Sequence, residues 1–268
     1  MVLDQWGLWI IDEAPMLTVA LFILFALIEV SGREHATSDG LTAGRMITNF
    51  GLTAMTGGLS LLVPLSSVGS AMIAEEQGIG LFNVVTLPWW LILPAALLSR
   101  TFFNYWLHRA FHAVPLLWRL HRIHHSDTHV DLTLSLRQHP FDLFPRLLVF
   151  IGGTFLLGLP VWAVAIVDLS LTAANYWEHI DRRMSPQTAR VLGAFLVTPE
   201  IHRIHHSASQ PQTDSNFGGG LIIWDRLFGT YLDPETCSVH RIGLGETDDM
   251  MAKSLWQQLL LPFKSLKP

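Results

Sequence analysis

Four long apolar stretches constrain the fold of this 268-residue chain more than any other feature of its sequence. About 20 consecutive apolar residues are enough for a helix to cross a bilayer. Only 15% of the residues are charged, whereas soluble domains usually carry about 25%. We therefore predict an all-α integral membrane protein with about four transmembrane helices arranged as two hairpins. The predicted spans are residues 15–32, 48–72, 82–105 and a hairpin at 144–177.

The segments between and after these stretches are polar and are predicted to form a cap on one side of the membrane. They cover residues 106–142 and 178–245. No linker is long or biased enough in composition to separate domains, so residues 1–268 are predicted to form a single membrane domain. The short amphipathic stretch Trp256–Phe263 is expected to lie on the membrane surface.

Two acidic residues lie within the predicted spans. Glu29 is near the end of the first span, where we expect it at the membrane interface. Asp168 lies inside the hairpin, at a depth where an acidic side chain is costly and is a functional candidate by default. It could equally cap a broken helix or face a polar interior, and the sequence leaves these alternatives open.

The distribution of Lys and Arg predicts the orientation, because cytoplasmic loops carry an excess of these residues. The residues before the first span include Asp4, Asp12 and Glu13 but no Lys or Arg. A secretory signal would begin with basic residues, so this stretch does not fit one. Arg33 and Arg45 follow the first span, and further arginines follow the third. The pattern predicts a multi-pass protein with its N-terminus outside and its cap in the cytoplasm.

Composition directs attention to histidine. The net charge of −5 gives no global basic field, so we expect no nucleic-acid partner. Cys237 is the single cysteine, which excludes a disulfide within the chain and a cysteine-based metal site. Thirteen histidines remain as the main candidates for chemistry.

Most of these histidines fall in short motifs. An HxxxH pair ends the third span, and the block His-Arg-Ile-His-His-Ser occurs twice in the polar segments. Positions i, i+3 and i+4 of a helix lie on one side of it, so each motif can direct its imidazoles to one place. A further histidine ends the hairpin. So many imidazoles exceed the needs of one ion and predict two. The predicted ligands are His108, His112, His121, His124, His125, His179, His202, His205 and His206.

The ligand type narrows the choice of metal. Imidazole favours Fe, Zn, Cu and Ni over Mg or Ca. An all-imidazole shell is neutral, so a bridging hydroxide or nearby carboxylates would have to balance the charge of the ions. The candidate carboxylates are Asp127, Asp131, Glu178 and Asp225.

The remaining histidines have simpler interpretations. His35 and His240 have no partners nearby in the sequence and are expected on the surface. His129 and His139 follow the second motif, and a structural role is favoured over ligation for both. A histidine-rich loop could bind stray metal weakly, but two identical blocks and a helical pair are hard to explain in that way.

The ordered motifs resemble those of the fatty acid hydroxylase / sterol desaturase superfamily. The likeness runs from about Phe102 to Pro234. It includes the three histidine motifs, Leu-Arg137-Gln-His139-Pro140, and Asn216-Phe-Gly218 followed by Trp224-Asp225-Arg226.

This resemblance implies a membrane di-iron oxygenase with a cytosolic metal-bearing cap. It implies two Fe ions, O2, two electrons from an external electron-donor protein, and hydroxylation of a lipid substrate taken from the bilayer. Relatives often carry another histidine where Asn175 stands, which leaves the coordination of one metal open. Residues that could orient the ligands are Asn175, Glu178, Arg137, His139, Asn216 and Asp225.

Other functions share some of these features. A lipid desaturase would use the same pair of metals, and only its product would differ. A non-redox zinc-binding membrane protein is the alternative from another class, and Zn could also occupy the sites of a purified oxygenase. A metal transporter would place its histidines inside the spans. We expect lipid to enter between the third span and the hairpin, along a wall of Phe102, Phe103, Trp106 and Phe111, which could equally be ordinary packing.

Overall fold

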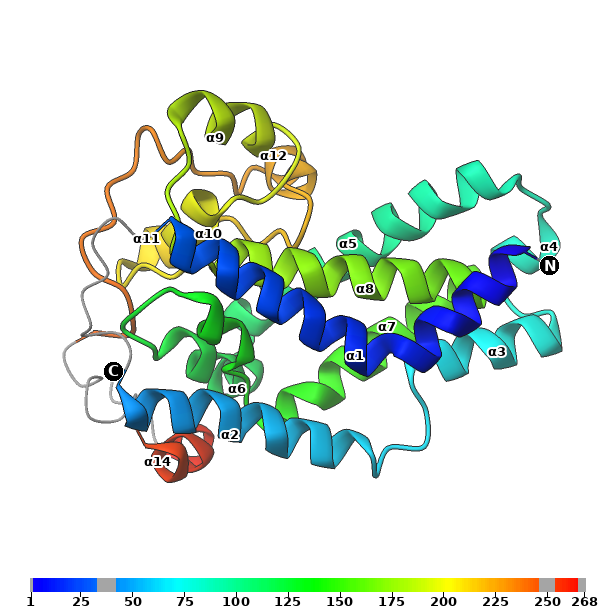
Figure 1. Cartoon of the computed structure of the whole chain (residues 1–268), viewed down its shortest axis with the longest axis horizontal. Coiled ribbons are helices and arrows are strands. Elements are labelled where there is room, and N and C mark those ends of the chain that lie inside the picture. Colours follow the sequence, from blue (N-terminus) through cyan, green and yellow to red (C-terminus); the bar gives the residue numbers. More distant parts are fainter. Residues whose placement is uncertain (1, 33–41, 246–253, 265–268) are drawn as a thin grey trace.

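The computed structural model describes residues 2–32, 42–245 and 254–264. The regular elements of these residues are α-helices and short 3-10 helices, joined by loops that form two isolated β-bridges. The predicted all-α class is therefore confirmed for the described part of the chain. The long helices run along the length of the molecule, and most of the short helices gather at one end (Figure 1).

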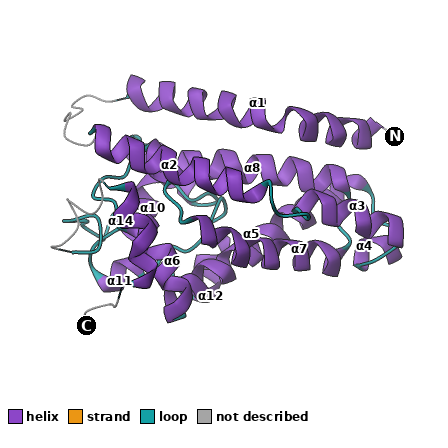
Figure 2. Cartoon of the chain, turned by 90° about the horizontal axis from the view of Figure 1, so that it is seen from below, coloured by secondary structure: helices purple, strands orange, loops and turns teal. Residues whose placement is uncertain are grey.

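The first helix, α1 (Val2–Ser31), is longer than the predicted span. It begins well before residue 15, because the polar residues near the N-terminus are part of the helix. Pro15 lies inside it. The helix packs along α8 and leaves Met16 and Leu27 exposed on its outer side. It lies along one edge of the bundle in Figure 2. Exposed apolar side chains of this kind suit contact with lipid.

The second predicted span, 48–72, is not one helix. α2 (Ala43–Ser60) ends before Pro64, and α3 (Ser67–Gln77) begins after Ser66, whose side chain accepts a hydrogen bond from the Gly69 N–H. Pro64 lies in the connection between them, and proline disfavours an unbroken helix because it has no backbone N–H to donate. The predicted second span is therefore two helices, as an early end at Pro64 would produce.

The third predicted span is also interrupted. The short α4 (Leu81–Val84) ends before Pro88, and α5 (Trp89–Ala113) follows it. α5 continues past residue 105 and carries the HxxxH motif on its last turns. The stretch predicted as a hairpin contains two helices, α7 (Leu143–Leu157) and α8 (Val161–His179), separated by Gly158 with a φ of 63°. α7 packs mainly against α3 and α5, and α8 mainly against α1, so the two helices are consecutive but are not packed against each other as a tight hairpin.

Length and composition identify fewer membrane-crossing helices than the four spans predicted. Among the described residues, Leu3–Ser31 and Pro140–Leu157 are long and apolar enough to cross a membrane. A third would exist if Ser67–Val84 and Trp89–Ala113, which are bent by 97° at their break, acted together. Four full spans therefore remain a prediction. α8 is largely buried, and its residues Trp162, Val164 and Val167 form a core against α3 and α5.

The short helices follow the polar segments of the sequence. Pro115 and Pro199 stand in the first turn of α6 and α10, where the missing N–H of proline costs nothing. The C-terminal amphipathic stretch is helical and leaves Trp256 and Phe263 exposed. The elements are α6 (Pro115–His125), 3-10 helices Leu132–Leu136, Pro140–Asp142 and Leu261–Phe263, α9 (Pro186–Gly193), α10 (Pro199–His205), α11 (Gln210–Thr213), α12 (Ile223–Phe228) and α14 (Leu255–Leu260).

Two buried polar anchors join these short helices to the long ones. Arg45 of α2 binds Asp127 at 2.8 Å and Asp131 at 2.6 Å. Glu29 of α1 accepts the backbone N–H groups of Leu132 and Asp181. Glu29 is only 5% exposed, so its side chain is buried against these segments, and its depth at the membrane interface stays a prediction.

Candidate metal centre

The predicted ligands lie together in the structure as two adjacent groups of buried or half-buried histidines. Within each group, one ligand nitrogen from every residue lies within 4.8 Å of those of the others. Group A consists of His108, His112, His121, His125 and His205. Group B consists of His124, His179, His202 and His206.

The expectation that each HxxHH motif directs its imidazoles to one place is corrected, because each motif is divided between the two groups. His121 and His125 of the first motif belong to group A, while His124 belongs to group B. In the second motif, His205 belongs to group A, while His202 and His206 belong to group B. With 3.6 residues per turn, positions i+3 and i+4 point about 100° apart around the helix. One motif can therefore serve two neighbouring sites.

The two rings of His124 and His179 show why group B fits a cation. Their Nδ1 atoms donate to the carbonyls of Arg137 and Asn175, at 3.2 and 2.7 Å. A carbonyl only accepts, so each neutral ring has its lone pair on Nε2. These two Nε2 atoms are 3.2 Å apart. Two lone pairs that face each other at this distance repel unless a cation lies between them.

Protonation does not remove this repulsion near neutral pH. Burial lowers the pKa of His179 to about 4 and holds the pKa of His124 well below its ordinary value. The neutral imidazole is also the form that binds metal. The donor set of group B is therefore ready for an ion.

The distances between neighbouring rings agree with shared ligation. Nε2 of His202 is 3.1 Å from Nε2 of both His179 and His206. In group A, Nε2 of His108 is 3.0 Å from Nε2 of His121. Imidazole nitrogens bind a first-row ion at about 2.1 Å, so two of them at right angles are about 3.0 Å apart. The observed spacings match adjacent ligands of one ion.

A short segment after α11 orients three ligands of group A. Nδ1 of His112 bonds to the carboxylate of Asp214 at 3.1 Å. Nδ1 of His205 and of His108 donate to the carbonyls of Ser215 and Phe217, both at 2.8 Å. Such partners fix the tautomer and direction of a ligating ring. Sequence reasoning missed Asp214, although an acid so soon after the second HxxHH motif was a visible signal.

Asn216 and Asp225 hold this segment in place. Asn216 has a φ of 51°, and its amide donates to the carbonyls of Ile201 and Leu232. The Asp225 carboxylate accepts the N–H groups of Phe217 and Gly218, each at 2.7 Å. Neither Asn216 nor Asp225 contacts a ligand ring through these bonds. Both residues instead hold the segment whose Ser215 and Phe217 carbonyls orient His205 and His108.

Arg137 and His139 differ in their placement. Arg137 is fully buried, its carbonyl accepts from His124, and its guanidinium donates to Asn49 at 2.8 Å and to Ile123 at 3.0 Å. Both ring nitrogens of His139 are occupied by backbone groups of Phe141 and Leu259. Arg137 therefore contacts a candidate ligand, His124, whereas His139 contacts backbone groups.

Three of the four candidate carboxylates bind partners other than the histidine groups. Asp127 and Asp131 bind Arg45, and Asp225 binds the backbone. Glu178 is buried beside His179 and accepts the N–H of Gly220, and burial raises the pKa of its carboxyl to about 8.

Other residues singled out in the sequence lie outside the two groups. His129 contacts the hydroxyl of Thr128, and His240 is exposed, as expected. His35 lies outside the described residues. Asn175 lies one turn before His179 and faces the cavity beneath group B. Group B therefore offers one imidazole fewer than group A.

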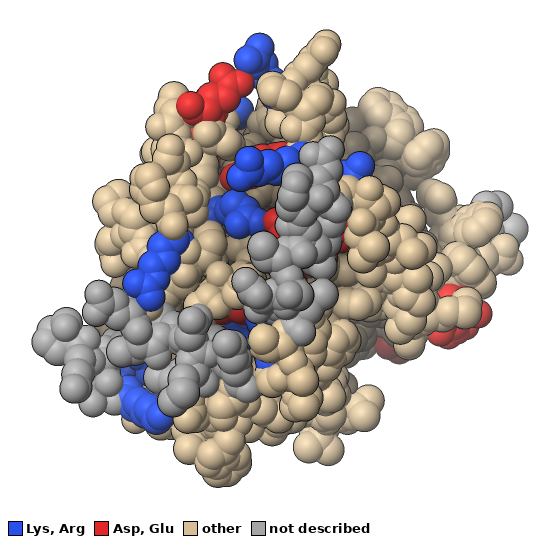
Figure 3. Space-filling view, turned by 60° about the vertical axis from the view of Figure 1, so that its left-hand side comes forward, with Lys and Arg blue, Asp and Glu red and all other residues tan. Residues whose placement is uncertain are grey.

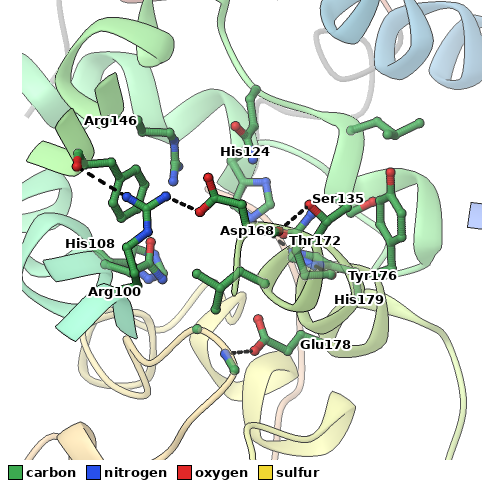
Figure 4. Close-up of a pocket in the computed structure, with 18 of the residues that line it drawn as sticks. Arg100, His108, His124, Ser135, Arg146, Asp168, Thr172, Tyr176, Glu178 and His179 are labelled. Carbon is green, nitrogen blue, oxygen red and sulfur yellow. Dashed lines mark hydrogen bonds and ion pairs between the residues drawn. The ribbon is translucent and has the colours of Figure 1, made fainter. Parts of the chain in front are cut away.

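A cavity of about 550 Å³ lies against the two groups. Figure 4 shows His108, His124 and His179 on its wall, together with Asp168 and Arg100, which form an ion pair. Asp168 thus faces a polar interior, one of the alternatives left open above.

The expected aromatic wall does not line this cavity. Phe102 packs against Trp224 and Trp106 packs against Phe228, with ring centroids 5.1 Å apart in both pairs. Phe111 is buried and stacks on His121. The contacts of these residues agree with the ordinary-packing alternative. The wall of this cavity combines polar side chains with apolar ones such as Phe150 and Leu171.

Comparison with known proteins gives a consistent result. The chain is 32% identical to alkylglycerol monooxygenase of Xenopus tropicalis over 230 residues, which is 82% of this chain and 48% of that protein. It is 33% identical to alkylglycerol monooxygenase of Danio rerio, covering 66% of this chain and 41% of that protein. It is 32% identical to ornithine lipid hydroxylase of Rhizobium tropici, covering 59% and 46%.

The chain thus spans less than half the length of these curated relatives. No solved structure matches it. The family model described as fatty acid hydroxylase matches residues 93–230, which include every histidine of groups A and B. Because the match covers more than half of the sequence, including all nine candidate ligands, the chain belongs to the fatty acid hydroxylase family.

Proposed function

We propose that the protein is a membrane di-iron oxygenase that hydroxylates a lipid with O2 and two electrons from an external electron-donor protein. The observation that carries this proposal is the pair of adjacent histidine groups on the wall of one cavity. In the overall reaction a C–H bond of the lipid becomes C–OH, and the second oxygen atom leaves as water after uptake of two electrons and two protons.

Iron is favoured over zinc for a chemical reason. Imidazole sets bind both metals, but only a redox-active pair can supply the reduction of O2 that attack on an unactivated C–H bond requires. The relatives are named as a monooxygenase and a hydroxylase, which supports the redox alternative over a non-redox zinc protein. This chain's own residues hold and orient the ligands and surround the cavity.

The charge distribution supports a cytoplasmic cap. Lys and Arg side chains are spread over the end that carries the short helices (Figure 3). Arg183 and Arg226 are exposed there, whereas Glu75 and Glu76 are exposed at the end of α3. Because basic residues are retained on the cytoplasmic side, we place the metal centre just cytoplasmic of the hydrocarbon boundary.

Anaerobic reconstitution with Fe(II), followed by a reductant, a membrane lipid extract and ¹⁸O2, tests the proposal. Mass spectrometry should find a lipid that has gained one ¹⁸O atom. Loss of two hydrogens without added oxygen would identify the desaturase alternative. Zinc-loaded protein is the matched control, and equal product from it would contradict the redox assignment.

A further inference from the structure

The C-terminal segment Ser254–Lys264 lies against the helix that carries the first HxxHH motif. It consists of α14, which contacts α2, and of the 3-10 helix after it, which contacts α6 (Figure 1). Ile123 stands between the histidines of the motif and is fully buried, in an apolar cluster with Leu52 and Leu261. The segment therefore packs on a residue inside the metal-binding motif.

Two side chains close to the candidate ligands in the sequence hold the end of this segment. Arg122, which is also inside the motif, donates to the carbonyls of Leu261 and Lys264. Nε2 of His139 donates to the carbonyl of Leu259 at 3.3 Å. Basic side chains that bind the last carbonyls of a helix stabilise its end in this way. The arginine and the isoleucine of the motif thus both contact the C-terminal segment.

α2 receives the segment at a glycine. A side chain at Gly51 would place its Cβ 2.8 Å from Cδ2 of Leu255, which is too close for two carbon atoms. Leu255 and Leu259 pack against the same apolar cluster. The segment therefore fits closely against α2 as well as α6.

Gln258 adds a polar contact between this segment and the end of α6. Its side chain is fully buried, and Oε1 lies 3.0 Å from Oγ of Ser126, the residue that follows the motif. The hydroxyl has one proton, and the carbonyl of Ile123 at 2.8 Å is a second acceptor for it. When Ile123 accepts that proton, the Gln258 amide with its O and N exchanged donates to Oγ instead. Gln258 and Ser126 are therefore hydrogen-bonded in either arrangement.

Arg137 extends this contact to a candidate ligand. Its guanidinium donates to Oγ of Ser126 at 3.1 Å and to the carbonyl of Ile123 at 3.0 Å, which holds it on the last turn of α6. Its own carbonyl accepts the bond from Nδ1 of His124. His124 belongs to group B, whereas the other histidines of this motif belong to group A. The chain of hydrogen bonds that starts at Gln258 therefore ends at group B.

We propose that the segment Ser254–Lys264 is a clamp on α6, and that Gln258 is a positioning residue for His124. The apolar packing holds the helix, and the bonds through Ser126 and Arg137 hold the carbonyl that orients one ring of group B. A ligating ring that is held in the correct direction binds its ion more tightly. The inference rests on the proposed function for the presence of metal in the two groups, but not for the oxygenation of lipid.

Release of zinc from the full-length protein in detergent tests the clamp without any turnover. Zinc-loaded protein is mixed with EDTA, and release from group B is identified as the phase that is missing in His202→Ala/His206→Ala. Gln258→Met keeps the size of the side chain but removes its hydrogen bonds. Loss of a partner that orients a ligand costs about 10- to 100-fold in metal affinity, and Gln258 acts through two other residues, so we expect about tenfold faster release from group B. Release from group A should be unchanged.

Gln257→Met is the matched control. The side-chain oxygen of Gln257 is buried and has no hydrogen-bond partner among the described residues, so this change should leave both phases as in wild type. Ser126→Ala interrupts the same chain of bonds and should also speed release from group B. Because the two residues act through one chain, adding Gln258→Met to Ser126→Ala should have little further effect.

Hydrogen exchange in the wild-type protein tests the same coupling if the variants fail to fold. Because linkage is reciprocal, an ion in group B should also tighten the clamp. The backbone amides of residues 255–263 should exchange more slowly in zinc-loaded protein than in metal-free protein. This protection should be absent from His202→Ala/His206→Ala, which lacks the group B ion. The exposed helix α9 is the internal control and should exchange equally in every sample.

The outcomes separate a positioning role from a merely structural one. A general loss of stability would speed release from both groups, because α6 also carries His121 and His125 of group A. Equal acceleration of both phases in Gln258→Met, or no acceleration, would therefore overturn the positioning role. Equal exchange of the segment with and without zinc would overturn the clamp.

The same measurements distinguish this inference from the proposed function. The expected pattern would support the clamp even if iron-loaded protein oxidised no lipid, which would contradict the proposed function alone. A wild-type protein that holds no zinc in group B would contradict both the clamp and the two-metal centre.

Discussion

The carboxylate of Asp214 and Nδ1 of His112 lie 3.1 Å apart and join α11 to the last turn of α5. The bond from His112 lowers the pKa of Asp214, so the side chain is an anion at neutral pH. An anionic acceptor strengthens a histidine ligand and fixes its direction.

Removal of this acceptor should weaken metal binding. Loss of a residue that orients a ligand typically costs about 10- to 100-fold in metal affinity or activity. We expect Asp214→Ala to release the ion of group A to a chelator faster than wild type by a factor in this range. Asp214→Asn keeps an acceptor and should be intermediate. Identical release from the alanine variant would argue against an orienting role.

A new imidazole should strengthen group B. Asn175 faces the cavity one turn before His179, and its backbone carbonyl, which orients His179, is unchanged by substitution. We expect Asn175→His to slow the loss of the group B ion during dialysis against a chelator. Asn175→Gln is the matched control, and equal retention in the histidine and glutamine variants would count against ligation from this position.

The buried cluster of Arg45 should be important for stability. Arg45→Met leaves Asp131 buried without the cation that it binds and leaves Asp127 with Arg137 alone, 3.8 Å away. Breaking a buried pair in this way costs about 3–5 kcal/mol. Thermal unfolding followed by tryptophan fluorescence should show a large fall in Tm, whereas Arg190→Met, on an exposed ion pair, should change it little. An unchanged Tm for Arg45→Met would show that the cluster contributes nothing net.

Labelling from either side of the membrane tests the proposed orientation. In a Cys237→Ser background, Gln210→Cys places a thiol on the exposed surface near α11, and Glu76→Cys places one at the end of α3. An impermeant maleimide should label the first only from the cytoplasm and the second only from outside. The reversed pattern would overturn the cytoplasmic placement of the cap.

Much of the fold could be predicted because it depends on local patterns. Apolar stretches gave the long helices, and Gly158 and Pro160 marked the break between α7 and α8 that the structure contains. Pro64 carried the signal for a kink or an early end of the second span, and the chain does break near it. The break before Pro88 was missed because continuous apolarity was weighted above the missing N–H of proline. The early start of α1 was hidden by polar residues that remain helical.

The candidate site was predictable as a set of residues but not as an arrangement. Motif spacing brought the histidines to attention, yet the division of each HxxHH motif between two groups depends on how α6 and α10 pack together. Backbone acceptors such as the Ser215 carbonyl carry no sequence signal. The polar side chains that α5 contributes to the cavity wall did carry one, because Arg100 and Asn104 precede His108 at helical spacing.

The most direct test of the two-site account is the metal content of three purified, iron-loaded proteins. Wild type should contain two ions per chain. His202→Ala/His206→Ala removes two ligands of group B and should leave about one ion, whereas His205→Ala/His206→Ala takes one ligand from each group and should leave less than one. A wild-type content of one ion, or equal contents in the two double variants, would contradict the account.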